Sequence, residues 1–114
     1  MLVLRPGRLY VRRYDTTFNL YECVSQYRGE SRVRIADTNN PPLSVDARDF
    51  VDVTHLFAWC GIAMGRGVSV VARGGEEKML VDTIHARSYD PFKQEAVYKL
   101  RRNEWVTHRD LIRV

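Results

Sequence analysis

The sequence predicts a mainly β protein made of two similar halves. β-Branched and aromatic residues recur with period two along Leu9–Tyr14 and Arg32–Ala36, which is the periodicity of a strand. Turn-forming residues separate such stretches at short intervals, as in Arg28–Ser31 and Asp90–Lys93. Further turns are expected at Asp15–Thr17, Thr38–Pro42 and Gly74–Glu77. Strands this short and this closely spaced favour a small barrel over a sandwich.

An internal repeat supports the division into halves. Val45–Val53 and Val106–Val114 share the pattern Val-x-x-Arg-Asp, followed by an apolar residue, Val or Ile, any residue and Val, at an offset of 106 − 45 = 61. Upstream, the expected matches are Gly7 with Gly67 and Leu20–Val24 with Leu80–Ile84, both at an offset of 60, and Arg32–Ile35 with Ala96–Leu100. This constant order predicts two copies of one unit, over residues 1–53 and 67–114.

Each unit opens and closes with a recognisable pattern. Gly7–Val11 reads Gly-Arg-Leu-Tyr-Val, and Trp105–Leu111 reads Trp-Val-x-x-x-Asp-Leu. In this layout the chain resembles the SH3-like small barrels of the KOW and Tudor type, arranged in tandem. The resemblance implies two SH3-like barrels and a general capacity for binding, without assigning individual site residues. Tandem barrels of this size are also typical of the proteins that phages and mobile elements encode to bind a host component.

Residues 54–66 form an apolar linker between the expected barrels. Thr54 is suited to begin a helix and Gly65 to end one. The apolar residues at helical spacing between them are Leu56, Trp59, Cys60, Ala63 and Met64. The pattern predicts a short helix that packs against both barrels and joins them into one cooperative unit. If this face instead meets another chain, the interface candidates are Leu56, Phe57 and Trp59.

Composition indicates an ordinary globular protein, with 45% hydrophobic and 28% charged residues. The longest apolar run, Leu56–Met64, is about half the length that spans a bilayer. Met1–Gly7 lacks the charged and apolar regions of a signal peptide. A cytoplasmic location is therefore expected, without membrane attachment.

Chemistry-bearing residues are few. The cysteines and histidines are Cys23, Cys60, His55, His85 and His108. Their spacing fits neither a zinc site nor a disulfide scaffold, so we expect no metal or other cofactor. A catalytic Cys–His pair would need an accessible thiolate, whereas both cysteines lie in apolar stretches where burial is expected. Phosphate-binding loops and nucleophile elbows are absent from the sequence, which predicts a protein that is not an enzyme.

The repeated Arg-Asp turn includes one more residue with a functional side chain, His108. His108 precedes it in the second copy, where the first copy has Ala47, so His108 is expected to be a surface residue. The shared pairs, Arg48-Asp49 and Arg109-Asp110, are expected to shape the turn by ion pairing or capping.

Two binding functions remain open. The net charge is +4, and 15 of the 18 basic residues are arginine, which suits phosphate contacts. The candidate nucleic-acid contacts are Arg12, Arg13, Arg28, Arg32, Arg34, Arg101 and Arg102. Binding of RNA or a single strand predicts that they share one face. We favour a protein-interaction adaptor or inhibitor, which predicts an apolar or aromatic groove between the halves. The partner's identity stays open, and so does homo-oligomer formation.

Overall fold

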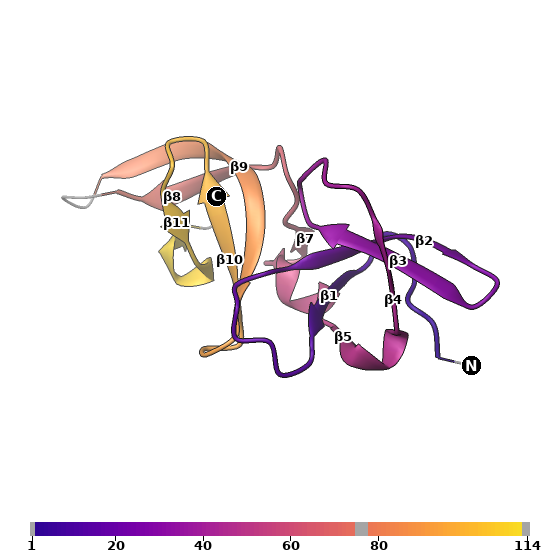
Figure 1. Cartoon of the computed structure of the whole chain (residues 1–114). Coiled ribbons are helices and arrows are strands. Elements are labelled where there is room, and N and C mark those ends of the chain that lie inside the picture. Colours follow the sequence, from indigo (N-terminus) through magenta and orange to yellow (C-terminus); the bar gives the residue numbers. More distant parts are fainter. Residues whose placement is uncertain (1, 75–77, 113–114) are drawn as a thin grey trace.

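Two five-stranded antiparallel sheets make up most of the molecule (Figure 1). The computed structural model describes residues 2–74 and 78–112, which form an elongated body of 51 × 25 × 25 Å. The predicted mainly β fold is confirmed. Of the turn expected at Gly74–Glu77 only Gly74 lies within the described residues, and the last two residues of the second repeat also lie outside them.

Both sheets have the same strand order, so the repeat in the sequence corresponds to a repeat in topology. The first sheet has the order β4-β3-β2-β1-β5, formed by β1 (Leu9–Arg12), β2 (Tyr21–Tyr27), β3 (Glu30–Ile35), β4 (Leu43–Val45) and β5 (Phe50–Asp52). The second has the order β11-β10-β9-β8-β12, formed by β8 (Ser69–Arg73), β9 (Met79–Asp90), β10 (Glu95–Leu100), β11 (Trp105–Val106) and β12 (Leu111–Ile112). A single 3₁₀ turn precedes the last strand of each sheet: η1 (Ala47–Asp49) and η4 (His108–Asp110).

Backbone hydrogen bonds at the start of each half show the repeat in detail. The Gly7 amide donates to the Cys23 carbonyl at 2.9 Å, and the Gly67 amide donates to the Ile84 carbonyl at 2.9 Å. Both glycines have left-handed backbone, with φ of 86° and 89°, which explains the residue type. The match of Gly7 with Gly67 is confirmed. Cys23 and Ile84 are thus equivalent, and they lie 84 − 23 = 61 positions apart in the sequence. The offset of 60 that the sequence comparison gave for β2 is therefore wrong by one residue. The stretch from Gly67 to Ile84 is therefore one residue longer than the stretch from Gly7 to Cys23.

The third strands place different side chains at equivalent positions. Ser31 pairs with Val45, and Tyr98 pairs with Val106, so β3 and β10 align at an offset of 98 − 31 = 67, larger than the sequence comparison indicated. Ser31 is buried, and its hydroxyl accepts a hydrogen bond from the Leu4 amide at 3.1 Å. The first sheet thus uses the N-terminal segment where the second uses a large aromatic ring.

One hydrophobic cluster joins the two halves. Its buried residues are Leu9, Leu20, Ala36 and Val53 from the first half, Phe57 and Met64 from the linker, and Val70, Ala72, Ile84, Tyr89, Ala96, Tyr98, Leu100, Val106 and Leu111 from the second. A smaller cluster lies within the first half alone: Leu4, Tyr10, Cys23, Val33, Ala47 and Phe50. Most of the buried apolar surface therefore belongs to a core that neither half could complete alone.

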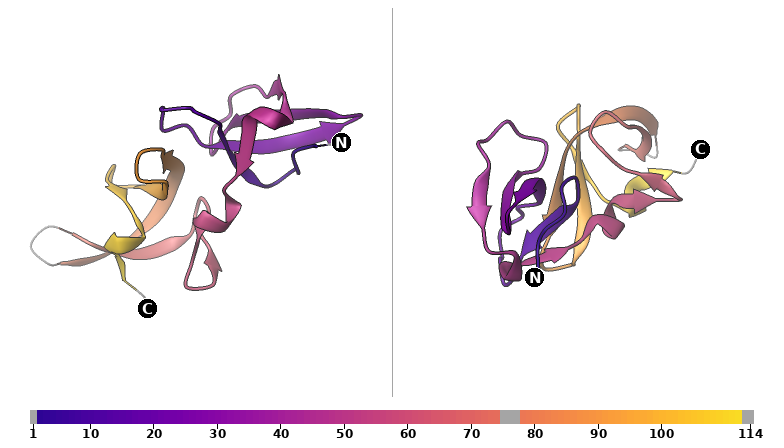
Figure 2. Two further views of the ribbon diagram at one scale, coloured as in Figure 1. Left: turned by 90° about the horizontal axis from the view of Figure 1, so that it is seen from below. Right: turned by 90° about the vertical axis from the view of Figure 1, so that its right-hand side faces the viewer.

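The linker differs from the expected helix. One 3₁₀ turn, η2 (Thr54–Phe57), is followed by a two-stranded hairpin of β6 (Ala58–Trp59) and β7 (Ile62–Ala63). Cys60 and Gly61 have φ of 51° and 78°, the left-handed pair that a two-residue type I′ turn needs. Glycine is unfavourable inside a helix and favourable in this turn, so the hairpin forms instead. Figure 2 shows this segment running between the two sheets.

Candidate binding site at the junction of the two halves

The first half covers one edge of β9. β10 occupies the other edge of that strand. The Tyr89 amide donates to the Phe18 carbonyl at 3.2 Å, and the Ser88 hydroxyl donates to the same carbonyl. Two residues earlier, the Arg87 amide donates to the Asp37 carboxylate at 2.9 Å. These contacts hold the loop that carries Phe18 against the second sheet.

An ion pair between Asp37 and Arg87 fixes this arrangement. The guanidinium Nε and Nη2 atoms donate to the two carboxylate oxygens, each at 3.0 Å. The Asp37 side chain is only 7% exposed and the Arg87 side chain 15%. A buried bidentate pair is directional, so it fixes how the halves sit together. Asp37 itself has a φ of 62°, a left-handed conformation that aspartate tolerates.

An apolar cavity of about 310 Å³, which we name the junction groove, lies where these elements meet. Phe18 from the first half lines it, together with Ser88, Val97 and Trp105 from β9, β10 and β11. Ser88 and Val97 are cross-strand partners on the face of the sheet opposite the core. Phe18 is 48% exposed and Trp105 is 55% exposed, and the Lys99 ammonium lies 5.9 Å from the Trp105 ring. The groove is thus open, largely aromatic and built from both halves.

A second cavity of about 510 Å³, which we name the basic pocket, lies at the turn between β9 and β10. Phe92 connects the two, because it lines the basic pocket and its ring lies 6.3 Å from that of Phe18. The pocket is lined by Val11, Arg12, Arg13, Tyr14, Asp15, Thr16, Val51, Val53, Tyr89, Pro91, Phe92 and Gln94. Tyr14 is 99% exposed, and Phe92 is 73% exposed. Aromatic side chains therefore continue from one cavity to the next.

The electrostatic balance at the basic pocket is positive. Arg12 and Arg13 form no ion pair with any carboxylate of the described residues. The one carboxylate that lines the pocket, Asp15, accepts hydrogen bonds from the Thr17 amide and hydroxyl at 2.8 and 2.7 Å. The Arg13 Nε atom donates to the Arg48 carbonyl at 2.9 Å, so the Arg12 guanidinium and the two terminal nitrogens of Arg13 are the groups that a ligand could use.

The other candidate arginines lie elsewhere. Three of them pair with acids: Arg32 with Glu30 at 3.5 Å, Arg34 with Glu22 at 2.9 Å, and Arg102 with Glu104 at 2.9 Å and Asp82 at 3.8 Å. Arg28 lies over the Tyr27 ring in the turn between β2 and β3, and Arg101 follows β10. In Figure 1 the β2–β3 turn lies at the right-hand end and the β10–β11 turn at the top of the left-hand half. Only Arg12 and Arg13 border the junction.

The interface candidates of the linker are used within the chain. Phe57 is 3% exposed, and its ring meets the Tyr98 ring edge-on at 5.8 Å. Leu56 and Trp59 are partly buried against the same shared cluster. These three side chains therefore pack within the chain, whereas Ile62 of the same segment is 55% exposed.

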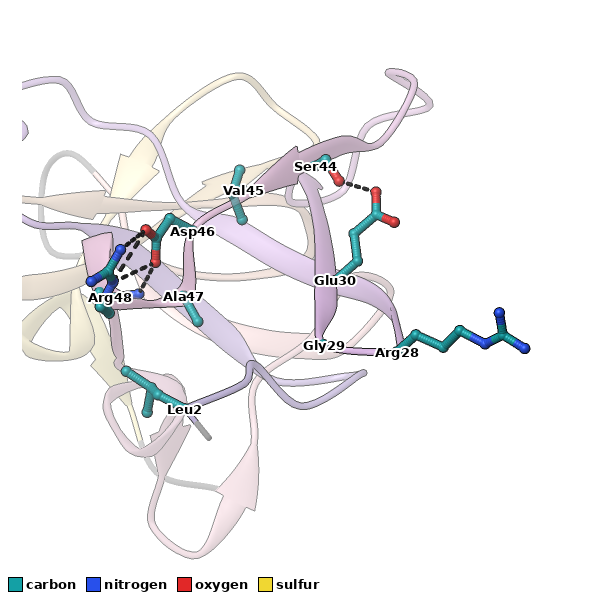
Figure 3. A pocket seen from close by; sticks show the side chains of 9 residues that line it. All are labelled: Leu2, Arg28, Gly29, Glu30, Ser44, Val45, Asp46, Ala47 and Arg48. Carbon is teal, nitrogen blue, oxygen red and sulfur yellow. Dashed lines mark hydrogen bonds and ion pairs between the residues drawn. The ribbon is translucent and has the colours of Figure 1, made fainter.

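The largest cavity, about 640 Å³, lies in the first half near the N-terminal segment (Figure 3). Its polar groups engage one another: Ser44 bonds to Glu30, and Arg48 bonds to Asp46 at 2.7 Å. Arg28 points away from it in Figure 3. Because its charged groups are already paired, this cavity is a weaker candidate than the junction groove.

His108 is not the surface residue expected from the sequence. Its Nε2 atom is hydrogen-bonded to the Tyr98 hydroxyl at 2.8 Å, and the two rings stack at 5.4 Å. Burial lowers the pKa of His108, and nearby Glu95 raises it by less. Burial likewise raises the pKa of Tyr98. His108 thus packs on Tyr98 of the cluster that the two halves share. Ala47, its equivalent in the first half, belongs to the smaller cluster.

The repeated Arg-Asp turn is shaped differently in the two halves. In the second, the Asp110 carboxylate accepts from the Thr107 amide at 2.9 Å, while Arg109 reaches Glu95 at 3.1 Å. In the first, Asp46 accepts from the amide and guanidinium of Arg48, which lowers the pKa of Asp46 to about 2. The role of these residues in the turn is structural, although the pairs are not the same.

The two cysteines lie in different surroundings. Cys23 is buried, which raises its pKa, whereas Cys60 is exposed at the tip of the linker hairpin. The expected burial of Cys60 is wrong, because the turn that replaces the helix points it outward. The described residues include no cluster of His, Cys, Asp and Glu that could hold a metal ion.

The predicted site residues included none of the groove residues, Phe18, Ser88, Val97 and Trp105, and did not include Phe92. Phe18 and Phe92 nevertheless stand out in the sequence. Each is a large aromatic side chain in a loop of polar and turn-forming residues, and that unusual context was the available signal.

Within the described part of the chain, no helix is long and apolar enough to cross a membrane. No protein-family model, curated protein or solved structure matches the chain. The junction groove therefore carries the functional argument.

Proposed function

We propose that the protein is a non-enzymatic adaptor or inhibitor that binds a segment of another protein in the junction groove. The observation that carries the proposal is the open aromatic surface of Phe18 and Trp105, to which both halves contribute. Exposed apolar grooves with a few polar groups at the rim are typical binding sites. A cavity of about 310 Å³ can accept one or two large side chains, the usual anchors of a docked peptide.

We further propose that each half is an SH3-like barrel. Three features support this: the shared strand order, the antiparallel pairing of the first strand with the last, and the 3₁₀ turn before the last strand. In such an arrangement β11 is a short edge strand, and Trp105 stands on it beside the groove. A peptide could therefore add hydrogen bonds along that edge while its side chains enter the groove.

Nucleic-acid binding is the second candidate. It is favoured by Arg12 and Arg13 together with the fully exposed Tyr14, since guanidinium groups bind phosphate and aromatic rings stack on bases. The patch is small, because the remaining candidate arginines lie elsewhere. Fluorescence anisotropy with single-stranded RNA at about 50 and 200 mM salt tests it, since phosphate contacts weaken steeply over that range.

A random-peptide display selection on the full chain tests the adaptor proposal. Wild-type protein should enrich peptides that bind with micromolar affinity, and Phe18→Ser and Trp105→Ser should each weaken that binding at least about tenfold. Leu43→Ser is the matched control, because Leu43 is a comparably exposed apolar residue on β4. Failure to enrich any peptide, or peptides that bind all four proteins equally, would refute binding in the groove.

A further inference from the structure

We infer that the preferred occupant of this site is an acidic protein segment with an apolar anchor. The inference rests on the proposed function and specifies the chemistry of the partner. The anchor enters the junction groove, and carboxylates on one side of it reach Arg12 and Arg13 in the basic pocket.

Continuity between the two cavities is the first step. The Phe18 and Phe92 rings are 6.3 Å apart, and each lines one of the cavities. Ser88 and Tyr89 are successive residues of β9 and point to opposite faces of that strand, so a bound segment passes from the groove to the basic pocket around Phe92 in the β9–β10 turn. One short peptide can therefore contact both cavities.

Charge is the second step. Arg12 and Arg13 line the basic pocket against one carboxylate, Asp15, which accepts a hydrogen bond from the Thr17 amide. Neither arginine forms an ion pair with a described carboxylate, and the Arg13 Nε atom donates to the Arg48 carbonyl at 2.9 Å. On the other side of the groove, Lys99 lies over Trp105.

The chemistry of these cations favours carboxylates. A guanidinium group can form two parallel hydrogen bonds with one carboxylate, and such charge-assisted bonds are stronger than neutral ones. A basic segment would place like charges together. A nucleic acid could use the same arginines through its phosphates but would not need the apolar groove, which makes Phe18 and Trp105 the discriminating residues.

The selection described above, made with peptides of unrestricted composition, tests the inference. Wild-type protein should enrich peptides in which Asp or Glu residues flank an aromatic or large aliphatic residue. The same selection on the Arg12→Gln, Arg13→Gln double variant should still enrich the apolar residue and lose the acidic bias. Arg28→Gln, Arg101→Gln is the matched control, since it removes two exposed arginines that line neither cavity and should keep the bias.

Affinity measurements on one enriched peptide complete the test. The Arg12/Arg13 variant should bind it about tenfold more weakly, and wild-type affinity should fall as salt increases. Apolar peptides without acidic bias would overturn the inference and leave the proposed function intact. No enriched peptide at all would defeat both. Displacement of the peptide by single-stranded RNA, with RNA affinity unchanged in Phe18→Ser and Trp105→Ser, would assign the arginines to nucleic acid and also overturn it.

Discussion

At the scale of single residues, His108 gives the protein a pH-dependent stability. Burial lowers its pKa below the ordinary value of 6.5. Below pH 6.5 the unfolded chain therefore binds a proton that the folded ring does not yet accept. Stability is thus fully present above pH 6.5 and falls as the pH drops towards the folded pKa. Urea unfolding between pH 7 and pH 5 should show this decrease, and His108→Phe should reduce it.

His55→Gln is the control for this experiment, because His55 is an exposed histidine of the linker turn. It should keep the wild-type dependence on pH. An unchanged dependence in His108→Phe would mean that other groups cause it and that burial of the His108 ring has little effect.

Breaking the Asp37–Arg87 pair should destabilise the protein strongly, because both side chains are largely buried. Asp37→Ala leaves a guanidinium group buried without its partner, which should lower the free energy of unfolding by about 3–5 kcal/mol. Asp37→Asn should cost less, because asparagine tolerates the left-handed backbone and still accepts the Arg87 amide. Urea denaturation measures both changes.

Arg109→Ala is the matched control for that pair. It removes an ion pair with Glu95 in which the arginine is 71% exposed, so the expected cost is at most about 1 kcal/mol. Equal effects of Asp37→Ala and Arg109→Ala would show that the buried pair does not hold the halves together.

At the scale of elements, the linker hairpin depends on its turn. Gly61 has a φ of 78° and open space around it, so Gly61→Ala acts through backbone strain alone and should cost about 1 kcal/mol. Cys60→Asn should stabilise the turn slightly, because asparagine favours that conformation in type I′ turns. Gly65→Ala, also in open space but without a positive φ, is the control and should be nearly neutral. Thermal unfolding measures all three, and equal effects of the two alanine substitutions would exclude the strain.

The elements also show what the sequence could and could not predict. Period-two patterns and turn residues identified most strands correctly, because those signals are local. The linker was mistaken for a helix because a short apolar run fits a helix and a buried hairpin alike, and the Cys60-Gly61 turn decides between them. The position of Phe18 depends on a hydrogen bond to Tyr89, 89 − 18 = 71 residues away, which no local pattern encodes.

At the scale of the whole molecule, the repeat and the site have different origins. The repeat could be read from the sequence because Gly7 and Gly67 begin equivalent units. The junction groove belongs to neither unit, since Phe18 comes from one and Trp105 from the other. A groove between the halves was expected in general terms, but its residues follow only from how the halves pack. Binding and the docking of the halves should therefore be coupled.

The shared core predicts that both halves unfold together. Leu9, Leu20, Ala36 and Val53 of the first half are buried in a cluster whose other buried members belong to the linker and the second half. The amides of Cys23 and Ile84 occupy equivalent places in the two sheets and donate to carbonyls at 3.1 and 3.0 Å.

In native-state hydrogen exchange, the Cys23 and Ile84 amides should therefore open with the same free energy, equal to that of global unfolding. Fluorescence of Trp59 and Trp105, which lie outside the first half, should report the same urea midpoint as far-ultraviolet circular dichroism, which reports both sheets. The isolated segment 1–53 should be less stable than the full chain, because it exposes its part of the shared cluster.

If the Cys23 amide exchanged at a lower free energy than the Ile84 amide, or if segment 1–53 matched the full chain in stability, the halves would be independent domains. The junction groove would then form only when they happen to dock, and its ligand affinity would be lowered by the fraction of molecules that are undocked.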